Sequence, residues 1–555
     1  MKRMTMIGDI GWSRFYHLGD EAMTEFALDA LRERANVEVT LIAGEPDCAA
    51  AMYGVDAISR IGFKRDRPPN AARLQAILDH AQSDGLRGGL AADDPAIGVI
   101  EAVRDSDAVL IAGGGNLNSM FAHHIFERAA LAKIARIFGK PYALTSQTLG
   151  PLIYDEDRDI VHDLLAEAEF VGTRESYTTR LAGELGAGDA TVRRQVDDAF
   201  SLTAGDSDRE AVADLADGPF VVASFAEKAS SPMISDPDYR QRVIEIVRRI
   251  AEETGLRVLL VPHGGAFSPA SPTRDQLTDA QIAAAADDES VQATRMLTAR
   301  QLVALTERAE FVIGTRYHAG IFSGAAAVPF ISLAPNLYSS IRMRGAAENV
   351  GMRDFVLPLD SIDDIVDTAA GVARNRDSLQ ATLRERSDAR RHEHRKWWDF
   401  LVETTLGREE ATASEGHPAS AEAPGFFPAD EVPNDYVANV ELVRERLNAV
   451  QDYGLVMAVK DRRAALARTE VNRLKAKLKR AEGRIERADA TIRRAESQQE
   501  LRERKPAVRA IRRVQKLGIR VRGAARYAPR LGGRWPAEAE EQTLNGERQS
   551  RNRAR

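Results

Sequence analysis

Hydrophobic and polar positions in the first 200 residues alternate between the spacing of buried strands and the spacing of amphipathic helices. Short apolar runs, each of strand length, occur at residues 4–10, 37–44 and 107–115. Between the first two runs, residues 21–33 place their apolar side chains on one helical face. Further strands are expected at residues 140–151, 168–176 and 192–200. Strands that alternate with helices predict a parallel sheet covered by helices on both faces.

A second series of the same kind starts near Gly218. Its strands are expected at residues 218–227, 256–265, 310–320 and 329–334, with helices at residues 239–255, 298–309 and 321–328. Two such series predict two Rossmann-like domains, residues 1–205 and 206–360, with a cleft between them. Ligands of open α/β sheets bind beyond the carboxyl ends of the strands, where the glycine-rich and charged turns of this chain lie.

The rest of the chain has a different character. Residues 361–406 have a helical pattern and are expected to pack back on the two domains, whereas residues 407–435 have the composition of a disordered linker. In residues 436–500, an apolar seam recurs at steps of four and three positions, which predicts a coiled coil and self-association. The alternative for this region is a single charged helix.

Acidic and basic residues are distributed unevenly along the chain. The net charge is −7, but residues 461–555 hold 28 basic and 12 acidic residues, so residues 1–460 carry −23. In the basic tail, residues 501–555, apolar side chains recur every third position from Val508 to Leu517. Such a helix can bind an anionic membrane surface or another polyanion. A solvated basic tail is the alternative, and nucleic acid is not an expected partner.

Composition excludes several classes of protein. The single cysteine, Cys48, rules out a disulfide framework and a multi-cysteine zinc site. The longest apolar stretches, such as Ala325–Ile331, fall far short of the roughly 20 residues that span a bilayer. No apolar segment follows the first basic residues, so we expect no secretory signal and therefore a cytoplasmic protein. If the basic tail binds membrane, we expect it to do so at the inner membrane face.

Three glycine-containing turns at predicted strand ends are candidates for ligand binding. In the turn after the first strand, Gly8, Gly11 and Gly19 allow tight turns, and Asp20 can cap the following helix. The turn lacks the dinucleotide fingerprint, so NAD binding is not expected. The other two turns hold Gly113, Gly114, Gly115 and Asn116, and Gln147 with Gly150. Each turn taken alone is also compatible with an ordinary strand-to-helix connection.

Two arginines and a histidine carry the strongest chemical signal. Arg174 follows a strand and offers a planar donor for phosphate or carboxylate, and the alternative is a surface pair with Glu175, which is common. Arg316 and His318 are two residues apart at the start of a small-residue helix. A cation beside a titratable imidazole predicts an anion-binding proton donor. The adjacent His123 and His124 do not have metal-ligand spacing, because neighbouring helical positions diverge.

Six motifs in order resemble the polysaccharide pyruvyl transferase family over roughly residues 1–360. They read HLGDEAM, IAGGGNLN, SQTLGP, GTRES, VDDAF and GTRYHAGIFSGAAAVPFISL. The resemblance implies a glycosyltransferase-B-like fold and transfer of the pyruvyl group of phosphoenolpyruvate to sugar hydroxyls of a surface glycan or its lipid-linked precursor. The resemblance also implies that Arg316 and Arg174 bind the anionic groups and that His318 is the general acid. It implies a second acid/base role for His124 or His123, and it calls for no metal or organic cofactor.

The chain also departs from the family. His17 stands where the family usually has Asn, and the segment 336–342 has no Lys, so Arg342 or Arg344 is the candidate replacement. The roles of His17, His123 and His263 stay open. Residues expected to contact substrate are Gly19, Asp20, Glu21, Gly113, Gly114, Gly115, Asn116, His124, Gln147, Gly150 and Arg342. The rival interpretations are a nucleotide-sugar glycosyltransferase of the same fold and a non-catalytic glycan-binding or assembly protein.

Overall fold

The structure is a computed structural model of the 555-residue chain. It describes residues 1–65, 68–151, 153–188, 191–230, 234–407 and 509–516, together with single positions and short runs between 471 and 494. The chain divides into two compact units, Met1–Lys460 and Asp461–Arg555. Apart from Gly407, the predicted linker at 407–435 lies outside the described residues, and so does almost all of the predicted coiled coil.

The first Rossmann-like domain is built on an eight-stranded sheet within the described residues. Strands run in the order β4-β3-β1-β5-β7-β8-β9, all pairs are parallel, and β6 pairs with β7. The strands are β1 (Lys2–Ile7), β3 (Val37–Ala43), β4 (Asp56–Ser59), β5 (Ala108–Ile111), β6 (Gly114–Leu117), β7 (Tyr142–Leu149), β8 (Phe170–Thr173) and β9 (Val192–Arg194). Every residue of β5 and β7 is buried, as expected of central parallel strands.

Helices alternate with these strands along the chain. They are α1 (Leu18–Arg34), α2 (Pro46–Tyr53), α3 (Pro68–Gln82), α4 (Pro95–Asp105), η1 (Ser119–Phe121), α5 (Ala122–Ile137), α6 (Asp155–Ala166), α7 (Ser176–Glu184) and η2 (Asp198–Ser201). The strand order turns outward on both sides of β1, so the carboxyl ends of β1 and β5 form the switch point where such sheets bind ligands.

The second domain repeats this plan with six parallel strands in the order β13-β11-β10-β14-β15-β16, within the described residues. The strands are β10 (Phe220–Ser224), β11 (Arg257–Leu260), β13 (Val291–Ala293), β14 (Phe311–Gly314), β15 (Phe330–Ala334) and β16 (Val356–Pro358). The helices are α8 (Asp206–Ala211), α9 (Asp236–Thr254), α10 (Asp275–Ala286), α11 (Ala299–Thr306), α12 (Tyr317–Ala325), α13 (Leu337–Glu348), η3 (Arg353–Phe355) and α14 (Ile362–Arg374). The two parallel sheets confirm the predicted fold class.

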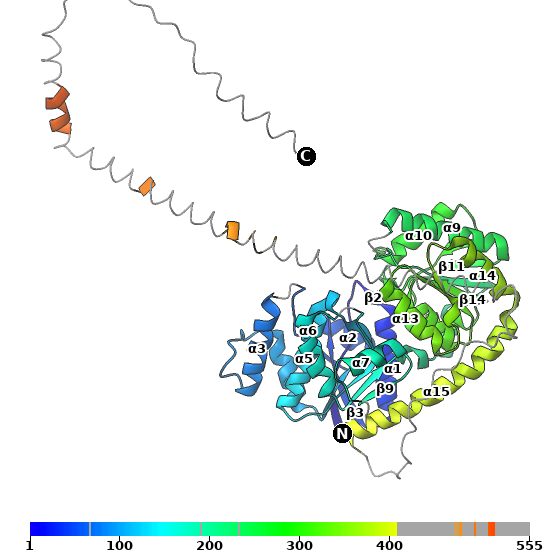
Figure 1. Ribbon diagram of the computed structural model, residues 1–555, viewed down its shortest axis with the longest axis horizontal. Helices are drawn as coiled ribbons and strands as arrows, with labels where there is room; N and C mark the ends of the chain where they lie inside the picture. The colour runs from blue at the N-terminus through cyan, green and yellow to red at the C-terminus, as the bar shows by residue number, and fades with distance from the viewer. Residues whose placement is uncertain are drawn as a thin grey trace, which may run out of the picture. The chain divides into compact units, whose positions relative to one another are not determined.

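A strand pair and a long helix are among the contacts that join the domains. The short strands β2 (Tyr16–His17) and β12 (Gly264–Gly265) pair antiparallel, one from each domain. The long helix α15 (Arg376–Leu406) leaves the second domain and runs back to the first, as Figure 1 shows in yellow. At its end Trp397, Trp398 and Leu401 are buried in the same hydrophobic cluster as side chains of β1 and β3. The helix therefore holds the two domains together on one side.

Candidate active site

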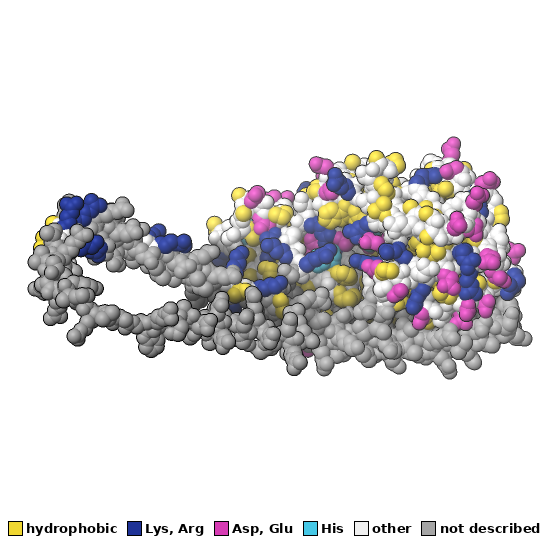
Figure 2. Space-filling model, turned by 90° about the horizontal axis from the view of Figure 1, so that it is seen from above, with side chains coloured by type: hydrophobic (Ala, Val, Ile, Leu, Met, Phe, Trp, Pro, Cys, Tyr) yellow, Lys and Arg dark blue, Asp and Glu magenta, His cyan; other side chains and the backbone are white. Residues whose placement is uncertain are grey.

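The carboxyl ends of the two sheets face each other across the domain boundary. The Tyr338 hydroxyl, from α13, donates a hydrogen bond of 2.8 Å to the Gly115 carbonyl in β6. Gly19, at the start of α1, lies directly against the imidazole of His318, because a Cβ placed on it would be 1.9 Å from Nδ1. In Figure 2, basic, acidic and histidine side chains gather near the middle of the visible face of the described body.

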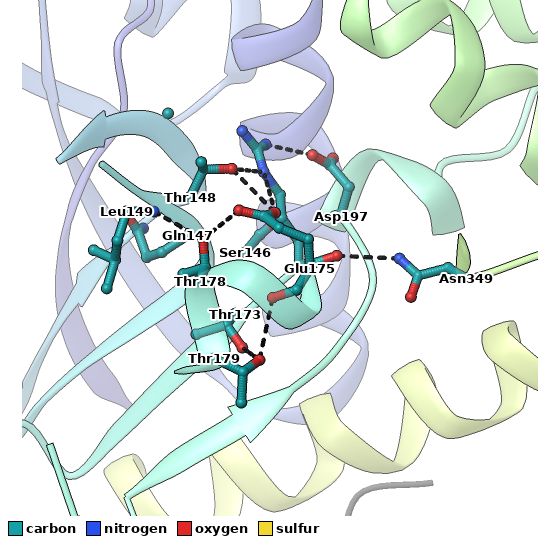
Figure 3. A network of polar contacts seen from close by, with 12 residues as sticks. Ser146, Gln147, Thr148, Leu149, Thr173, Glu175, Thr178, Thr179, Asp197 and Asn349 are labelled. Carbon is teal, nitrogen blue, oxygen red and sulfur yellow. Dashed lines mark hydrogen bonds and ion pairs between the residues drawn. The ribbon is translucent and has the colours of Figure 1, made fainter. Parts of the chain in front are cut away.

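Arg174 lies inside this boundary and is almost fully buried. Its side chain is 1% exposed, its Nε donates to Thr148 at 2.8 Å, and its guanidinium pairs with Asp197 at 2.5 Å. The guanidinium also lies over the ring of Tyr317, 4.5 Å from the centroid. Figure 3 shows Thr148, Glu175 and Asp197 in this network. From the sequence, Arg174 is expected to bind an anion or to form a surface pair with Glu175, whereas the structure holds it in the interior with carboxylate neighbours.

Asp197 and Asp198, the adjacent acids of the VDDAF motif, serve two different partners. Asp197 caps η2 through the amide of Ala199 at 2.9 Å, pairs with Arg174, and lies 3.7 Å from Nε2 of His318. Asp198 accepts a hydrogen bond of 3.1 Å from Trp398 on α15. The motif therefore links the charged centre to the helix that joins the domains.

His318 sits on α12 beside these groups. Its side chain is 13% exposed, and its Nε2 has no hydrogen-bond partner among the described residues. Burial, together with the cation of Arg174, holds the pKa of this imidazole well below its usual value. The ring is therefore neutral near physiological pH.

Arg316 caps the same helix and points to a different acid. It forms an ion pair with Asp275, whose carboxylate also accepts the amides of Glu227 at 3.2 Å and His263 at 3.3 Å. The Arg316 side chain is 24% exposed, and its Nε is not hydrogen bonded within the described structure. Arg316 therefore has donor capacity left for a second anion.

Arg342 is the arginine of this region that pairs with no carboxylate in the described part of the chain. Its guanidinium lies over the ring of Tyr338 at 3.9 Å and over that of Tyr317 at 5.3 Å. Cation–π contacts hold the cation in place without neutralising it. Arg342, half-buried on α13, is therefore the best placed of the three arginines to bind an anionic ligand.

The first loop contributes His17 and Asp20. The Asp20 carboxylate is within hydrogen-bond distance of Nδ1 of His17, and the imidazole side chain is 37% exposed. Partial burial alone would lower the pKa of His17, but the Asp20 carboxylate outweighs it and raises the pKa above its usual value. His17 therefore holds a proton more readily than His318.

Glu21 lies beneath the loop rather than on its surface. The carboxylate is fully buried, accepts the amide of Gly11 at 3.1 Å and is hydrogen bonded to the Tyr53 hydroxyl. Burial raises its pKa to about 8, so the group is neutral at physiological pH. Its contacts hold the glycine turn in place.

His124 belongs to a separate charged cluster at the carboxyl edge of the first sheet. Its Nδ1 is 3.1 Å from Arg60 and 3.0 Å from Arg128, and both arginines also contact Glu127. Burial and the Arg128 cation lower the pKa of His124 to about 2. Its acceptor nitrogen is therefore occupied by two guanidinium groups. The ring of His123 lies against that of His124, with centroids 4.0 Å apart and planes tilted by 37°.

The other residues expected to bind substrate line the first domain's strand ends. Gln147 is 2% exposed and donates to the carbonyls of Ala112 and Thr145 at 2.9 and 2.8 Å, so its amide supports backbone. A Cβ on Gly113 would meet Met23 and Ser146, and one on Gly115 would lie 2.4 Å from the Tyr338 hydroxyl. The glycines thus permit close packing at the boundary. Gly114, Asn116 and Gly150 flank these positions in β6 and after β7.

Several residues of this centre have contacts that the sequence does not reveal. His263 is 4% exposed, its Nε2 is not hydrogen bonded within the described structure, and its backbone carbonyl accepts the Leu18 amide at 3.0 Å. Tyr317 and Tyr338 become functional candidates only through the cations that lie on their rings. Asp197 and Asp275 are separated by many residues from the arginines they pair with, so only the fold reveals these pairs. Within the described residues, no group of three or more His, Cys, Asp or Glu side chains is arranged to hold a metal ion.

A sequence profile described as "Polysaccharide pyruvyl transferase" matches residues 17–336, more than half of the chain. The chain belongs to this family of transferases. The matched region begins at His17 and includes Arg174, Arg316 and His318. Tyr338 and Arg342 follow directly after it. Among curated proteins, none matches the chain.

Solved structures of other proteins show a distant likeness. The UDP-GlcNAc 2-epimerase from Neisseria meningitidis bound to UDP-GlcNAc is 10% identical with a TM-score of 0.47, over 74% of this chain and 100% of that one. Anabaena HepE in complex with UDP and glucose is 12% identical with a TM-score of 0.46, over 73% and 99% of the two chains. Since these TM-scores are below 0.5, the fold assignment rests on the strand order given above. Among the described residues, no helix has the length and apolar character needed to cross a bilayer.

Proposed function

We propose that this protein transfers the pyruvyl group of phosphoenolpyruvate to two hydroxyls of a cell-surface glycan or its lipid-linked precursor, forming a ketal and releasing phosphate. The observation that carries the proposal is the position of Arg342, a cation without a carboxylate partner among the described residues, over the ring of Tyr317, the neighbour of His318, whose Nε2 is not hydrogen bonded in the described structure. Arg342 suits an anionic donor, and His318 suits proton exchange with it.

Phosphoenolpyruvate carries a phosphate and a carboxylate, so it needs more than one cation. In our proposal Arg342 and Arg316 bind these groups, since both have donor capacity left. Arg174 instead acts as a positioning residue, because its guanidinium already pairs with Asp197. This differs from the role that the family resemblance gives Arg174. The His318 imidazole lies beside the bound donor and exchanges a proton with the reacting groups.

The reaction can be tested directly with the full-length chain. Phosphoenolpyruvate and candidate glycan acceptors should together yield inorganic phosphate and an acceptor whose mass has increased by one pyruvate less one water. Calorimetry should show phosphoenolpyruvate binding without acceptor. If UDP- or GDP-sugars bind while phosphoenolpyruvate does not, the function proposed here is wrong and a glycosyltransferase is favoured.

Replacing Arg342 with glutamine should weaken phosphoenolpyruvate binding by about 10- to 100-fold, because a charge-assisted hydrogen bond contributes about 1.5–3 kcal/mol. The change keeps a polar side chain of similar length over Tyr338, so the fold should persist. Calorimetric titration measures the effect. Arg308→Gln, at an exposed position beyond α11, is the matched control and should bind like the wild type. Equal affinity of the Arg342 and Arg308 variants would exclude Arg342 from the donor site.

The basic tail is proposed to bring the enzyme to an anionic membrane surface near a lipid-linked acceptor. Residues 509–516 are helical and exposed, and include Ile511 and Val514, 59% and 70% exposed, among Arg509, Arg512, Arg513 and Lys516. Each cation near an anionic surface contributes about 1 kcal/mol. Replacing these four cations with glutamine in the full chain should therefore reduce sedimentation with phosphatidylserine vesicles at least about tenfold. Unchanged binding, or equal binding to neutral vesicles, would contradict the proposal.

A further inference from the structure

His17 occupies a junction between the two domains. It forms β2, which pairs with Gly264–Gly265 of the second domain, and the next residue, Leu18, donates its amide to His263. Gly19, two residues after His17, lies against the ring of His318. The His17 side chain is therefore held at the same domain boundary as the proposed donor site.

The geometry of His17 is that of a carboxylate–imidazole dyad. Its Nδ1 is hydrogen bonded to Asp20, and the ring of Phe15 stacks on it with centroids 5.6 Å apart and planes 24° apart. Its Nε2 has no partner among the described residues, and 37% of the side chain is exposed. A carboxylate at Nδ1 fixes the ring orientation and stabilises the imidazolium, so the second nitrogen presents an N–H to the open side.

The other histidines of the region lack this arrangement. His124 has two arginines at Nδ1, and its Nε2 is 3.8 Å from Asp9, beyond hydrogen-bond distance. His263 is buried, and its unpaired Nε2 has no carboxylate beside it in the described structure. His318 is 3.7 Å from Asp197, which already pairs with Arg174. Among these histidines, only His17 is hydrogen bonded to a carboxylate while remaining accessible.

We propose that His17, held by Asp20, is the catalytic residue that gives a proton to C3 of phosphoenolpyruvate, and that His318 is the base for the acceptor hydroxyl. This rests on the proposed function and reverses the role that the family resemblance gives His318. The family's usual Asn at the position of His17 cannot carry out this step, so the proton donor is particular to this sequence.

The proton transfers balance over one turnover. Nε2–H of His17 protonates C3, and C2 becomes an electrophilic cation stabilised by its oxygen. The first hydroxyl oxygen bonds to C2 and its proton passes to Nε2 of His318. The bond from C2 to the phosphate oxygen then breaks, the electron pair leaves with phosphate, and His318 gives its proton to that phosphate. The second hydroxyl bonds to C2, and its proton restores the proton that His17 lost.

Charged groups around His17 set the direction of the pH dependence. Asp20 and Asp9 favour its protonated form, whereas Arg316, His263 and His318 oppose it when charged. Asp20 dominates, so the pKa of His17 lies above its usual value. An acid must be protonated to work, so kcat should fall as pH rises through this raised pKa. Asp20→Asn removes the carboxylate and should move the falling limb to lower pH.

The test compares His17→Asn, Asp20→Asn and the control His162→Gln, which changes an exposed residue on α6. Loss of a general acid costs about 10²–10⁴ in rate, so His17→Asn should lower kcat by that factor with phosphoenolpyruvate affinity within about twofold of wild type. Asp20→Asn should be active, with its alkaline limb shifted to lower pH. A wild-type pH profile in Asp20→Asn, or turnover above a tenth of wild type in His17→Asn, would overturn the assignment.

A second measurement distinguishes failure of the proposed function from failure of the assignment of His17 as proton donor. NMR titration of the imidazole resonances needs no substrate, and should show a raised pKa for His17 that falls in Asp20→Asn. If this dyad is present but wild-type protein releases no phosphate from phosphoenolpyruvate with any acceptor, the function is wrong rather than the dyad. If wild-type protein turns over and the His17 pKa is the same in both proteins, the proton-donor assignment is wrong.

Discussion

His318→Ala is expected to bind phosphoenolpyruvate but to release no detectable phosphate. Nε2 of His318 lies 3.7 Å from Asp197 and has no hydrogen-bond partner within the described structure, and alanine has no replacement for it. Removing a positioned acid or base typically costs about 10²–10⁴ in rate. Arg342 and Arg316 remain in place, so donor affinity should change little. Phosphate release and calorimetry on the same preparation separate the two effects.

The matched control for this variant is His162→Ala, which removes an imidazole from the exposed face of α6. It should retain wild-type turnover. A melting curve close to that of wild type would show that the His318 variant is folded. Turnover above a tenth of the wild-type rate in His318→Ala would contradict any proton-transfer role for this residue. Loss of phosphoenolpyruvate binding would instead make His318 part of the donor-binding surface.

The two sheets were predictable because their strands are short, continuous apolar runs between helical segments. Buried parallel strands require such runs, and β5 and β7 are buried along their whole length. The two-residue strands β2 and β12 could not be predicted in this way. They exist because one domain pairs with the other, and this pairing depends on the position of the domains rather than on local pattern.

The candidate site was predictable in its residues but not in their pairing. The motif at 314–320 indicates Arg316 and His318, and both lie at the domain boundary. The same pattern gives no sign that Asp275 pairs with Arg316, or that Asp197 draws Arg174 into the interior. Each pair joins residues from different elements, so only the folded structure shows which cationic side chains remain available to bind a ligand. Arg342 emerges as the anion-binding candidate for this reason.

For His17, the sequence does not indicate a functional role at all. The sequence marks it as a departure from the family without suggesting a role, although Asp20 follows at i+3. In a regular helix this spacing brings side chains together, but His17 precedes the helix. Its contact with Asp20 joins the N-cap residue of α1 to the third residue of that helix, at the point where β2 pairs with β12. The fold therefore places the dyad at the domain boundary, which the local pattern does not predict.

Asp197→Ala should destabilise the protein by about 3–5 kcal/mol, because the buried guanidinium of Arg174 loses its nearest carboxylate and keeps only Glu175, 3.8 Å away. Both side chains are at most 1% exposed, so water cannot replace the lost carboxylate. The variant also loses the cap of η2 at the Ala199 amide. For a domain of this size, the melting temperature should fall by about 10 °C. Thermal unfolding followed by circular dichroism measures the shift.

A second substitution separates the ion pair from the cap. Arg174→Met in the Asp197→Ala background removes the uncompensated charge and should restore most of the lost stability, since buried ion pairs are often replaceable by apolar side chains. Asp163→Ala, which removes the half-exposed partner of Lys133, should leave the melting temperature nearly unchanged. If Asp197→Ala melts like Asp163→Ala, the Arg174–Asp197 pair does not organise the centre. If the double variant is no more stable than Asp197→Ala, the cap at Ala199 is the dominant contribution.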